Sequence, residues 1–469
     1  MELHSVKRKL AAIFAAGVKD YSRLMGRVGG AHLSRPALVA VGLLIAGGIV
    51  ALLYPSFPTL ITRHSSLVTQ EEALPLPDKP SVAVLPFTNM SGDPDQEYFS
   101  DGLAEDLTTD LAKISGLFVI ASDSAFTYKG KTVKVQEVSR ELGVRYVLEG
   151  SARKIGDRVR ITIQLVDATR DQPLWSEQYD RPLQDLFAVQ DEIRQKIVTT
   201  LKLQLTLAEQ MLLARGRSDN LEAYDYFLRG QELFGRLTKE ANAQARQMYE
   251  AAIELDPQYA AAYASVSWTY LFDALFGWSQ DRHALGLAFV LAQMAVALDD
   301  SLPGAHVVLG MAYLFGRQYD QAIVEEERAV ALSPNNADSC RLLADVLTAA
   351  GQPEEAIGLV EKAMRLNPHY PAVYVSSLGW AYLVTGRYEE AIATLKKALS
   401  RNPSLVHADY GLAISYSELG REEEARAEVK KILSVTPNAS LAGARRGWLF
   451  KDRSVVERHL AALRKAGLK

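Results

Sequence analysis

Cysteine is nearly absent from this sequence of 469 residues, with Cys340 as the single example. One cysteine excludes an intramolecular disulfide framework and any metal site built from several thiolates. Histidine is also scarce, with eight residues and no HExxH pattern among them. An excess of positive charge is missing as well, because 52 Lys and Arg stand against 56 Asp and Glu. The composition therefore gives no indication of a nucleic-acid-binding surface, and we expect neither a metal nor another cofactor.

Long hydrophobic runs are equally rare, and only one stretch suggests a membrane span. Residues 37–54 carry no charge, and a helix needs about 20 predominantly apolar residues to cross the hydrocarbon core. Residues 1–36 contain seven Lys and Arg against two acids, so the positive-inside rule places this basic segment in the cytoplasm. Residues 55–79 are expected to be a linker. Within the span, Gly42 and Ala46 form a small-residue pair through which two copies could associate.

A cleaved signal peptide is the alternative interpretation of this apolar run. Its charged region would be 36 residues long, and no A-x-A cleavage site follows the run. A soluble cytoplasmic protein is a further alternative, which would require that the run does not insert. The charge asymmetry around the run favours a retained anchor, with the lipid bilayer as its partner.

Strand and helix patterns alternate from residue 80 to residue 206 and predict an α/β domain. Residues 81–87 form a short apolar run that is typical of a buried strand. Leucines recur at helical spacing over residues 103–111, and Ser100 is expected to cap that helix. Alternating β-branched residues between 144 and 166 indicate a β-hairpin.

This domain resembles the TolB amino-terminal-like domain in three segments: PSVAVLPFTNMSGDPDQEYFSDGLAEDLTTDLAKI, GVRYVLEGSARK and WSEQYDRPLQDLFAVQDEI. Such domains occur in bacterial envelope and signalling proteins and are non-enzymatic. The resemblance therefore implies protein contacts and brings no catalytic residues. It also implies a bacterial envelope protein. Together with the single apolar run and its charge asymmetry, this predicts one crossing of the bacterial inner membrane, with the N-terminus in the cytoplasm and the later domains in the periplasm.

Self-similarity from residue 220 to residue 437 predicts a helical repeat array. Equivalent unit endings at positions 300, 334, 368, 403 and 437 are spaced by 34, 34, 35 and 34 residues. This is the period of the tetratricopeptide repeat (TPR), a helix–turn–helix unit. We expect six repeats, followed by a helical cap over residues 438–469. Helix C-caps are expected at Gly316, Gly351, Gly386 and Gly420.

TPR arrays bind peptides or helices on the concave face, which the first helix of each unit lines. The predicted groove residues of the second to sixth units are Trp268, Phe272, Met311, Phe315, Arg341, Asp345, Trp380, Leu383, Tyr410 and Ile414. The set is apolar and aromatic with one charged band, which indicates a protein or peptide partner with an apolar face. For each side chain, packing against the next repeat is the alternative.

The segment VKRKLAAIFAAGVKDYSRLM, residues 6–25, resembles the opening of bacterial class III adenylate cyclase domains. In that family a metal-binding Asp ends the first strand, whereas Gly17 stands at this position here, and Asp20 is displaced by three residues. Two-metal phosphoryl chemistry needs carboxylates to hold the cations, and the 36 residues before the apolar run are too few for such a domain. The sequence therefore favours a non-enzymatic, membrane-anchored interaction adaptor with a cyclase-like remnant. A truncated or degenerate cyclase-related signalling protein is the alternative.

Overall fold

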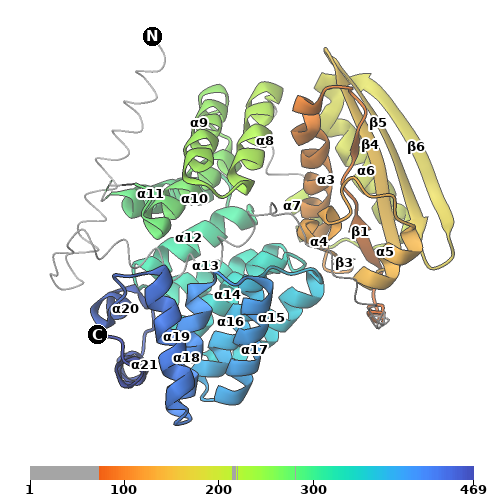
Figure 1. Ribbon diagram of the computed structural model, residues 1–469. Helices are drawn as coiled ribbons and strands as arrows, with labels where there is room; N and C mark the ends of the chain where they lie inside the picture. The colour runs from red at the N-terminus through yellow and green to blue at the C-terminus, as the bar shows by residue number, and fades with distance from the viewer. Residues whose placement is uncertain (1–72, 214–217, 219, 280, 282) are drawn as a thin grey trace.

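The computed structural model describes residues 73–213, 218, 220–279, 281 and 283–469 (Figure 1). The basic N-terminal segment and the membrane helix expected at 37–54 lie outside this part of the chain. Within the described part, no helix is both long and apolar enough to span a bilayer. An α/β region comes first, and an all-helical solenoid follows it.

The α/β region is built on one mixed sheet with the strand order β3–β1–β4–β5–β6, and β2 pairs with the far end of β4. β1 is parallel to both β3 and β4, whereas β4, β5 and β6 form an antiparallel meander. The strands are β1 (Ser81–Val84), β2 (Thr88–Asn89), β3 (Phe118–Val119), β4 (Tyr146–Ile155), β5 (Arg158–Asp167) and β6 (Gln172–Pro182).

Helices cover both faces of this sheet. One face packs on α3 and α6, and the alternate side chains of β1 pack on α4 and α5. A 3-10 turn capped by the Asp93 side chain leads directly into α3, so the helix begins at Glu97. Ser100, the expected cap, is therefore a buried residue inside α3. The helical elements are η2 (Pro94–Gln96), α3 (Glu97–Ala112), α4 (Ser122–Phe126), α5 (Val135–Leu142), η3 (Leu183–Asp185), α6 (Leu186–Thr200) and α7 (Leu207–Leu213).

The solenoid consists of successive antiparallel helix pairs. The pairs are α8 (Leu221–Gly235) with α9 (Lys239–Leu255), α10 (Ala260–Phe276) with α11 (Ala284–Leu298), α12 (Pro303–Phe315) with α13 (Tyr319–Leu332), α14 (Ala337–Ala350) with α15 (Pro353–Leu366), α16 (Ala372–Val384) with α17 (Tyr388–Arg401), and α18 (Val406–Glu418) with α19 (Glu422–Val435). α20 (Leu441–Gly447) and α21 (Arg453–Lys465) close the C-terminal end. We number these helix pairs as units one to six.

Small residues allow the two helices of a unit to approach closely. A Cβ atom added at Gly379 of α16 would lie 2.7 Å from the Leu395 side chain of α17, and buried alanines such as Ala391 and Ala398 repeat this pattern. Leu395 itself is fully buried. Packing of this density explains why the sequence repeats small residues at fixed positions.

The turn inside each unit needs one residue with a left-handed backbone. Gly386 (φ 81°) and Gly420 (φ 74°) supply it in units five and six, and glycine tolerates this conformation because it has no Cβ. In unit three Gly316 has a negative φ, and Arg317 (φ 56°) takes the left-handed position instead. A non-glycine residue there costs about 1 kcal/mol, so some contact of Arg317 must offset it.

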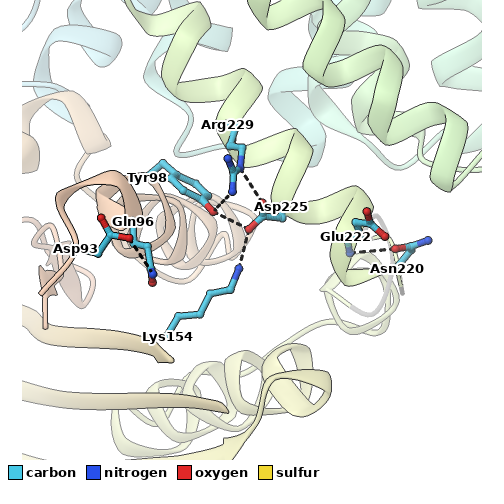
Figure 2. Close-up of polar contacts among 8 residues, drawn as sticks. All are labelled: Asp93, Gln96, Tyr98, Lys154, Asn220, Glu222, Asp225 and Arg229. Atoms are coloured by element: carbon cyan, nitrogen blue, oxygen red, sulfur yellow. Dashed lines mark hydrogen bonds and ion pairs between the residues drawn. The ribbon is translucent and has the colours of Figure 1, made fainter. Parts of the chain in front are cut away.

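The α/β region docks on the solenoid at two places. Figure 2 shows the first, where Asp225 of α8 accepts hydrogen bonds from Tyr98 (2.7 Å) and Lys154 (2.8 Å) of the α/β region, and Arg229 closes the cluster. Burial opposes ionisation of Asp225, but the bonds from Lys154 and Tyr98 outweigh it and hold the pKa of Asp225 below its ordinary value. The cluster therefore holds α3 beside α8 (Figure 1).

The second docking site uses the turn that follows α13 and the last helical turn of α15. Asn335 donates to the carbonyl oxygens of Ala112 (3.3 Å) and Ile114 (3.0 Å), and Arg365 donates to that of Gly143 (2.9 Å). Units one, three and four are thus all tied to the same α/β region.

Candidate binding groove

A cavity of about 740 Å³ lies on the concave side of the solenoid. Its wall is formed by the first helices of the units, by α3, and by residues 447–450 near the C-terminus. Small-molecule and peptide-side-chain pockets in proteins commonly hold about 300–1,000 Å³. The cavity is therefore large enough for a ligand or for several side chains of a partner.

The N-terminal end of the cavity is aromatic. Phe272 of α10 lies 4.9 Å from the ring of Phe234 and 5.9 Å, edge to face, from Trp268. Met311 of α12 continues this wall toward unit four. Helical spacing of four residues puts Trp268 and Phe272 on one face of α10, and this face would offer an apolar partner a large contact area.

A charged band crosses the middle of the cavity. Arg341 of α14 pairs with Asp345 one turn later, with 2.6 Å between Nη1 and Oδ2. Asp338, one turn before Arg341, accepts a hydrogen bond from the Tyr374 hydroxyl at 2.8 Å. The Arg341 Nη1 and the Tyr374 hydroxyl thus have hydrogen-bond partners within the band, whereas the buried Arg341 Nε has none among the described residues.

Asp123 of α4 and Asp338 of α14 line the same cavity from the two regions of the fold, and their charges interact. Burial and then the charge of Asp338 raise the pKa of Asp123 to about 6, against a hydrogen bond from Asn367 at 3.3 Å. Glu105 of α3 also lies near Asp123, and burial raises its pKa to about 7. Close by, the Nδ1 atom of His369 in the solenoid lies 2.9 Å from the hydroxyl oxygen of Thr127, which follows α4 in the α/β region.

A short C-terminal segment closes one rim of the groove. We call residues 446–451 the C-terminal strap. The side chain of Arg317 donates to the carbonyl oxygen of Trp448 at 2.9 Å, and the Lys451 amide donates to that of Ala349 at 2.7 Å. The Lys451 ammonium also pairs with Asp320 at 2.9 Å. The left-handed Arg317 thus gains its offsetting contact from a segment about 130 residues away.

The strap also covers the groove at unit five. The Trp380 ring stacks on His407 at 4.4 Å and lies 6.3 Å from Trp448 and 5.9 Å from Phe450. Trp380 and Trp448 are both buried, and within the described part of the chain neither indole N–H has a hydrogen-bond partner. Indole N–H groups usually find a partner when buried, so two donors are unused at this end of the cavity.

The structure separates the ten predicted groove residues into two sets. Those lining the cavity are Trp268, Phe272, Met311, Arg341, Asp345 and Trp380. Those packed outside its lining are Phe315, Leu383, Tyr410 and Ile414. Leu383 and Ile414 are fully buried between repeats, and Tyr410 packs on the strap residue Trp448. The repeat register indicated the concave face correctly for the first set, but sequence reasoning missed α3 and the strap as walls.

Glu326 of α13 is an unusual residue behind the charged band. It is fully buried, and within the described residues neither carboxylate oxygen has a hydrogen-bond partner. Burial raises its pKa well above the ordinary value, and the nearby Arg341 does not outweigh that effect. It packs against Gly310, where an added Cβ would lie 2.8 Å from the Glu326 Cγ.

Comparisons with known proteins identify the class of the solenoid. A family model described as Tetratricopeptide repeat matches residues 316–378, 347–408 and 382–446. The C-terminal part of the chain is therefore a TPR solenoid. A model described as HilA/YgeH-like transcriptional regulator, second domain, matches residues 78–196, which is the α/β region. The comparisons do not show the TolB-like domain that the sequence resembles.

Two curated relatives are similar over part of their length. The chain is 47% identical over 262 residues to a Rhizobium meliloti (strain 1021) protein named "Putative adenylate cyclase 3", which is 55% of this chain and 44% of that protein. It is 26% identical over 168 residues to Transcriptional regulator HilA of Salmonella typhimurium, which is 36% of this chain and 30% of that protein. The chain thus spans less than half the length of either relative.

Solved TPR structures resemble the solenoid only loosely. MamA is 25% identical with a TM-score of 0.29, covering 39% of this chain and 92% of that chain. YrrB, described as a TPR protein with an unusual peptide-binding site, is 22% identical with a TM-score of 0.30, covering 40% and 93%. Because both scores are below 0.5, the assignment of the repeats depends on the family model and on the helix pairs themselves.

Proposed function

We propose that this protein is a membrane-anchored, non-enzymatic adaptor whose TPR groove binds an apolar or aromatic segment of a partner protein. The observation that carries the proposal is the cavity on the concave face, whose walls combine aromatic side chains with two unused indole donors. Apolar walls with a few directed polar groups are typical of recognition sites. The uncharged run at 37–54, with basic residues before it, supports the anchor, and it supports placing the α/β region and the solenoid in the periplasm.

The named relatives support a binding module more than a particular activity. One relative is named as a cyclase and another as a transcriptional regulator. Two different activities in proteins that share parts of this chain are expected if the shared part supplies recognition and another part supplies the output. The groove would then be the recognition surface.

A site-specific crosslinking experiment tests groove binding. A photoreactive phenylalanine would replace Trp268 in the full-length chain in cells, and Glu327, which is exposed on α13, would carry the same group as the matched control. We expect a discrete protein adduct from position 268 and none from position 327. Identical adducts from both positions would contradict groove binding.

A relation to adenylate cyclases is the second candidate, supported by the 47% identity to the Rhizobium relative and by the cyclase-like residues 6–25. Gly17 at the expected metal-binding position argues against catalysis. The test is formation of cyclic AMP from ATP by the full-length chain with Mg²⁺ or Mn²⁺. We expect no product above that of an unrelated membrane protein, and measurable turnover would replace the adaptor proposal by the enzymatic one.

The topology proposal has its own test. Reporters that are active only in the periplasm or only in the cytoplasm would be fused after Lys469. We expect periplasmic activity, and cytoplasmic activity would contradict the orientation drawn from the basic segment.

A further inference from the structure

Carboxylates outnumber cations in the wall of the cavity. The lining includes five aspartates but only one lysine and one arginine, Lys113 and Arg341. Both cations already have partners, because Lys113 pairs with Asp110 at 3.0 Å and Arg341 with Asp345 at 2.6 Å. Asp110 also pairs with Arg194, which lies outside the lining, at 3.0 Å. The cavity is therefore an electronegative chamber with aromatic walls, and such a field favours a cationic ligand.

The excess negative charge is concentrated where the α/β region meets unit four. Asp123 and Asp338 come from different regions of the fold and repel one another across this junction. Asp338 has Arg341 at 3.8 Å, a distance that leaves the pair weak. A positively charged group from a ligand would remove the repulsion that now raises the pKa of Asp123.

Unused hydrogen-bonding groups lie in the same wall. Ser333 and Ser376 both line the cavity, and each is 2% exposed. Within the described part of the chain neither hydroxyl has a hydrogen-bond partner. Buried hydroxyl groups normally have partners, so these hydroxyls point independently to a polar ligand in the cavity.

The chain itself provides an example of what this face accepts. The strap and the residue before it read Arg-Arg-Gly-Trp-Leu-Phe-Lys, a basic and aromatic sequence. Its Trp448 and Phe450 rings pack beside Trp380, and its Lys451 reaches Asp320. The cavity wall thus already accepts the two aromatic rings of the strap, whereas the Lys451–Asp320 pair lies outside the cavity lining.

We propose that the cavity recognises an extended peptide of a partner protein in which a Lys or Arg adjoins aromatic residues, with the cation held between Asp123 and Asp338. The aromatic residues pack on the apolar wall at Trp268. This inference rests on the proposed groove function and specifies the chemistry of its partner.

A peptide titration on the full-length chain tests the inference. The probe is a fluorescein-labelled copy of residues 444–452, and its two counterparts replace either the basic residues by Glu or the aromatic residues by Ala. Binding is followed by fluorescence anisotropy at low salt. A charge-assisted contact contributes enough for about tenfold tighter binding of the basic aromatic peptide than of either counterpart.

Variants assign the effect to the cavity. The double variant Asp123→Asn, Asp338→Asn should weaken binding of the basic peptide about tenfold and remove most of its salt dependence. Asp171→Asn is the matched control, because Asp171 is exposed, lies outside the cavity and has a left-handed backbone that Asn also adopts. Melting curves would verify that each variant is folded.

The outcomes separate this inference from the groove proposal. Equal binding of the basic and acidic peptides, absence of any binding, or unchanged affinity in the double Asn variant would each overturn the charge recognition. The groove proposal would still stand if Trp268→Ala with Phe272→Ala abolished binding in the same titration, or if the photoreactive group at position 268 captured a partner. The groove proposal itself would fail if the Trp268→Ala, Phe272→Ala variant bound the peptide normally and the photoreactive group at position 268 captured no partner.

Discussion

The buried acid Glu326 allows a quantitative prediction about stability. Its side chain is fully buried and without a hydrogen-bond partner in the described part of the chain, so burial favours its neutral, protonated form. Keeping a carboxyl group neutral costs about 1.4 kcal/mol for each pH unit above its unfolded pKa of about 4.3, which is up to about 4 kcal/mol at pH 7. Glu326→Met replaces it with an apolar side chain of similar length and should remove this cost.

The sign of the pH dependence follows from the direction of the pKa shift. Because burial raises the folded-state pKa of Glu326, its contribution to stability is full below the unfolded pKa and is lost as the pH rises toward the folded pKa. The difference in the free energy of unfolding between Glu326→Met and the wild type should therefore be smallest near pH 4. The free energy of unfolding of the variant should exceed that of the wild type by about 2–4 kcal/mol at pH 7.

Urea denaturation followed by circular dichroism, repeated from pH 4 to pH 8, would measure this difference. Glu327→Met is the matched control, because Glu327 is the exposed neighbour on the same helix, and its difference from the wild type should not change with pH in this way. A Glu326→Met variant that is destabilised at every pH, or whose gain is constant with pH, would refute the reasoning.

Three further predictions concern the groove and the docking of the two regions. Arg317→Gly removes the strap contact, so limited proteolysis within residues 446–451 should become about tenfold faster. The melting temperature should change little, because the substitution also relieves the left-handed backbone at this position. An unchanged cleavage rate would contradict the strap contact. Affinity for the basic peptide should rise from pH 5 to pH 7 as Asp123, with its pKa of about 6, becomes ionised. The double Asn variant at Asp123 and Asp338 should lose this rise. A rise that persists in this variant would contradict the role of the two aspartates. Asp225→Asn should weaken docking of α3 on α8 by about 2 kcal/mol, which would be measured as faster hydrogen exchange in both helices. In the wild type, docking should weaken as the pH falls through the lowered pKa of Asp225. Unaltered hydrogen exchange in the variant would contradict the contact.

The sequence predicted the large features of the fold because periodic patterns encode them. The 34-residue period and the alternation of strand and helix indicated a TPR solenoid after an α/β region, and both are confirmed. Local detail was less accessible, as Ser100 illustrates. The preceding 3-10 turn leads straight into α3, so the helix begins three residues before the expected cap.

The groove was only partly predictable because its walls come from distant parts of the chain. Repeat register alone identifies which side of each helix faces inward, and this suffices for Trp268 or Arg341. It carries no information about the strap, whose six residues have no periodicity and bind Arg317 through backbone oxygens. Nor do polar residues such as Asn335, in a turn, and Arg365, at the end of α15, reveal that they hold the α/β region.

The double fastening of the solenoid has a mechanical consequence. An open repeat array behaves like a spring whose end units can fray one at a time, because each unit touches only its neighbours. Here the strap ties the C-terminal cap back to unit three, and the α/β region ties units one, three and four together. These ties restrain the spacing between the repeats. A substitution at Trp448 should therefore also destabilise unit three, and the described solenoid should unfold as one cooperative unit.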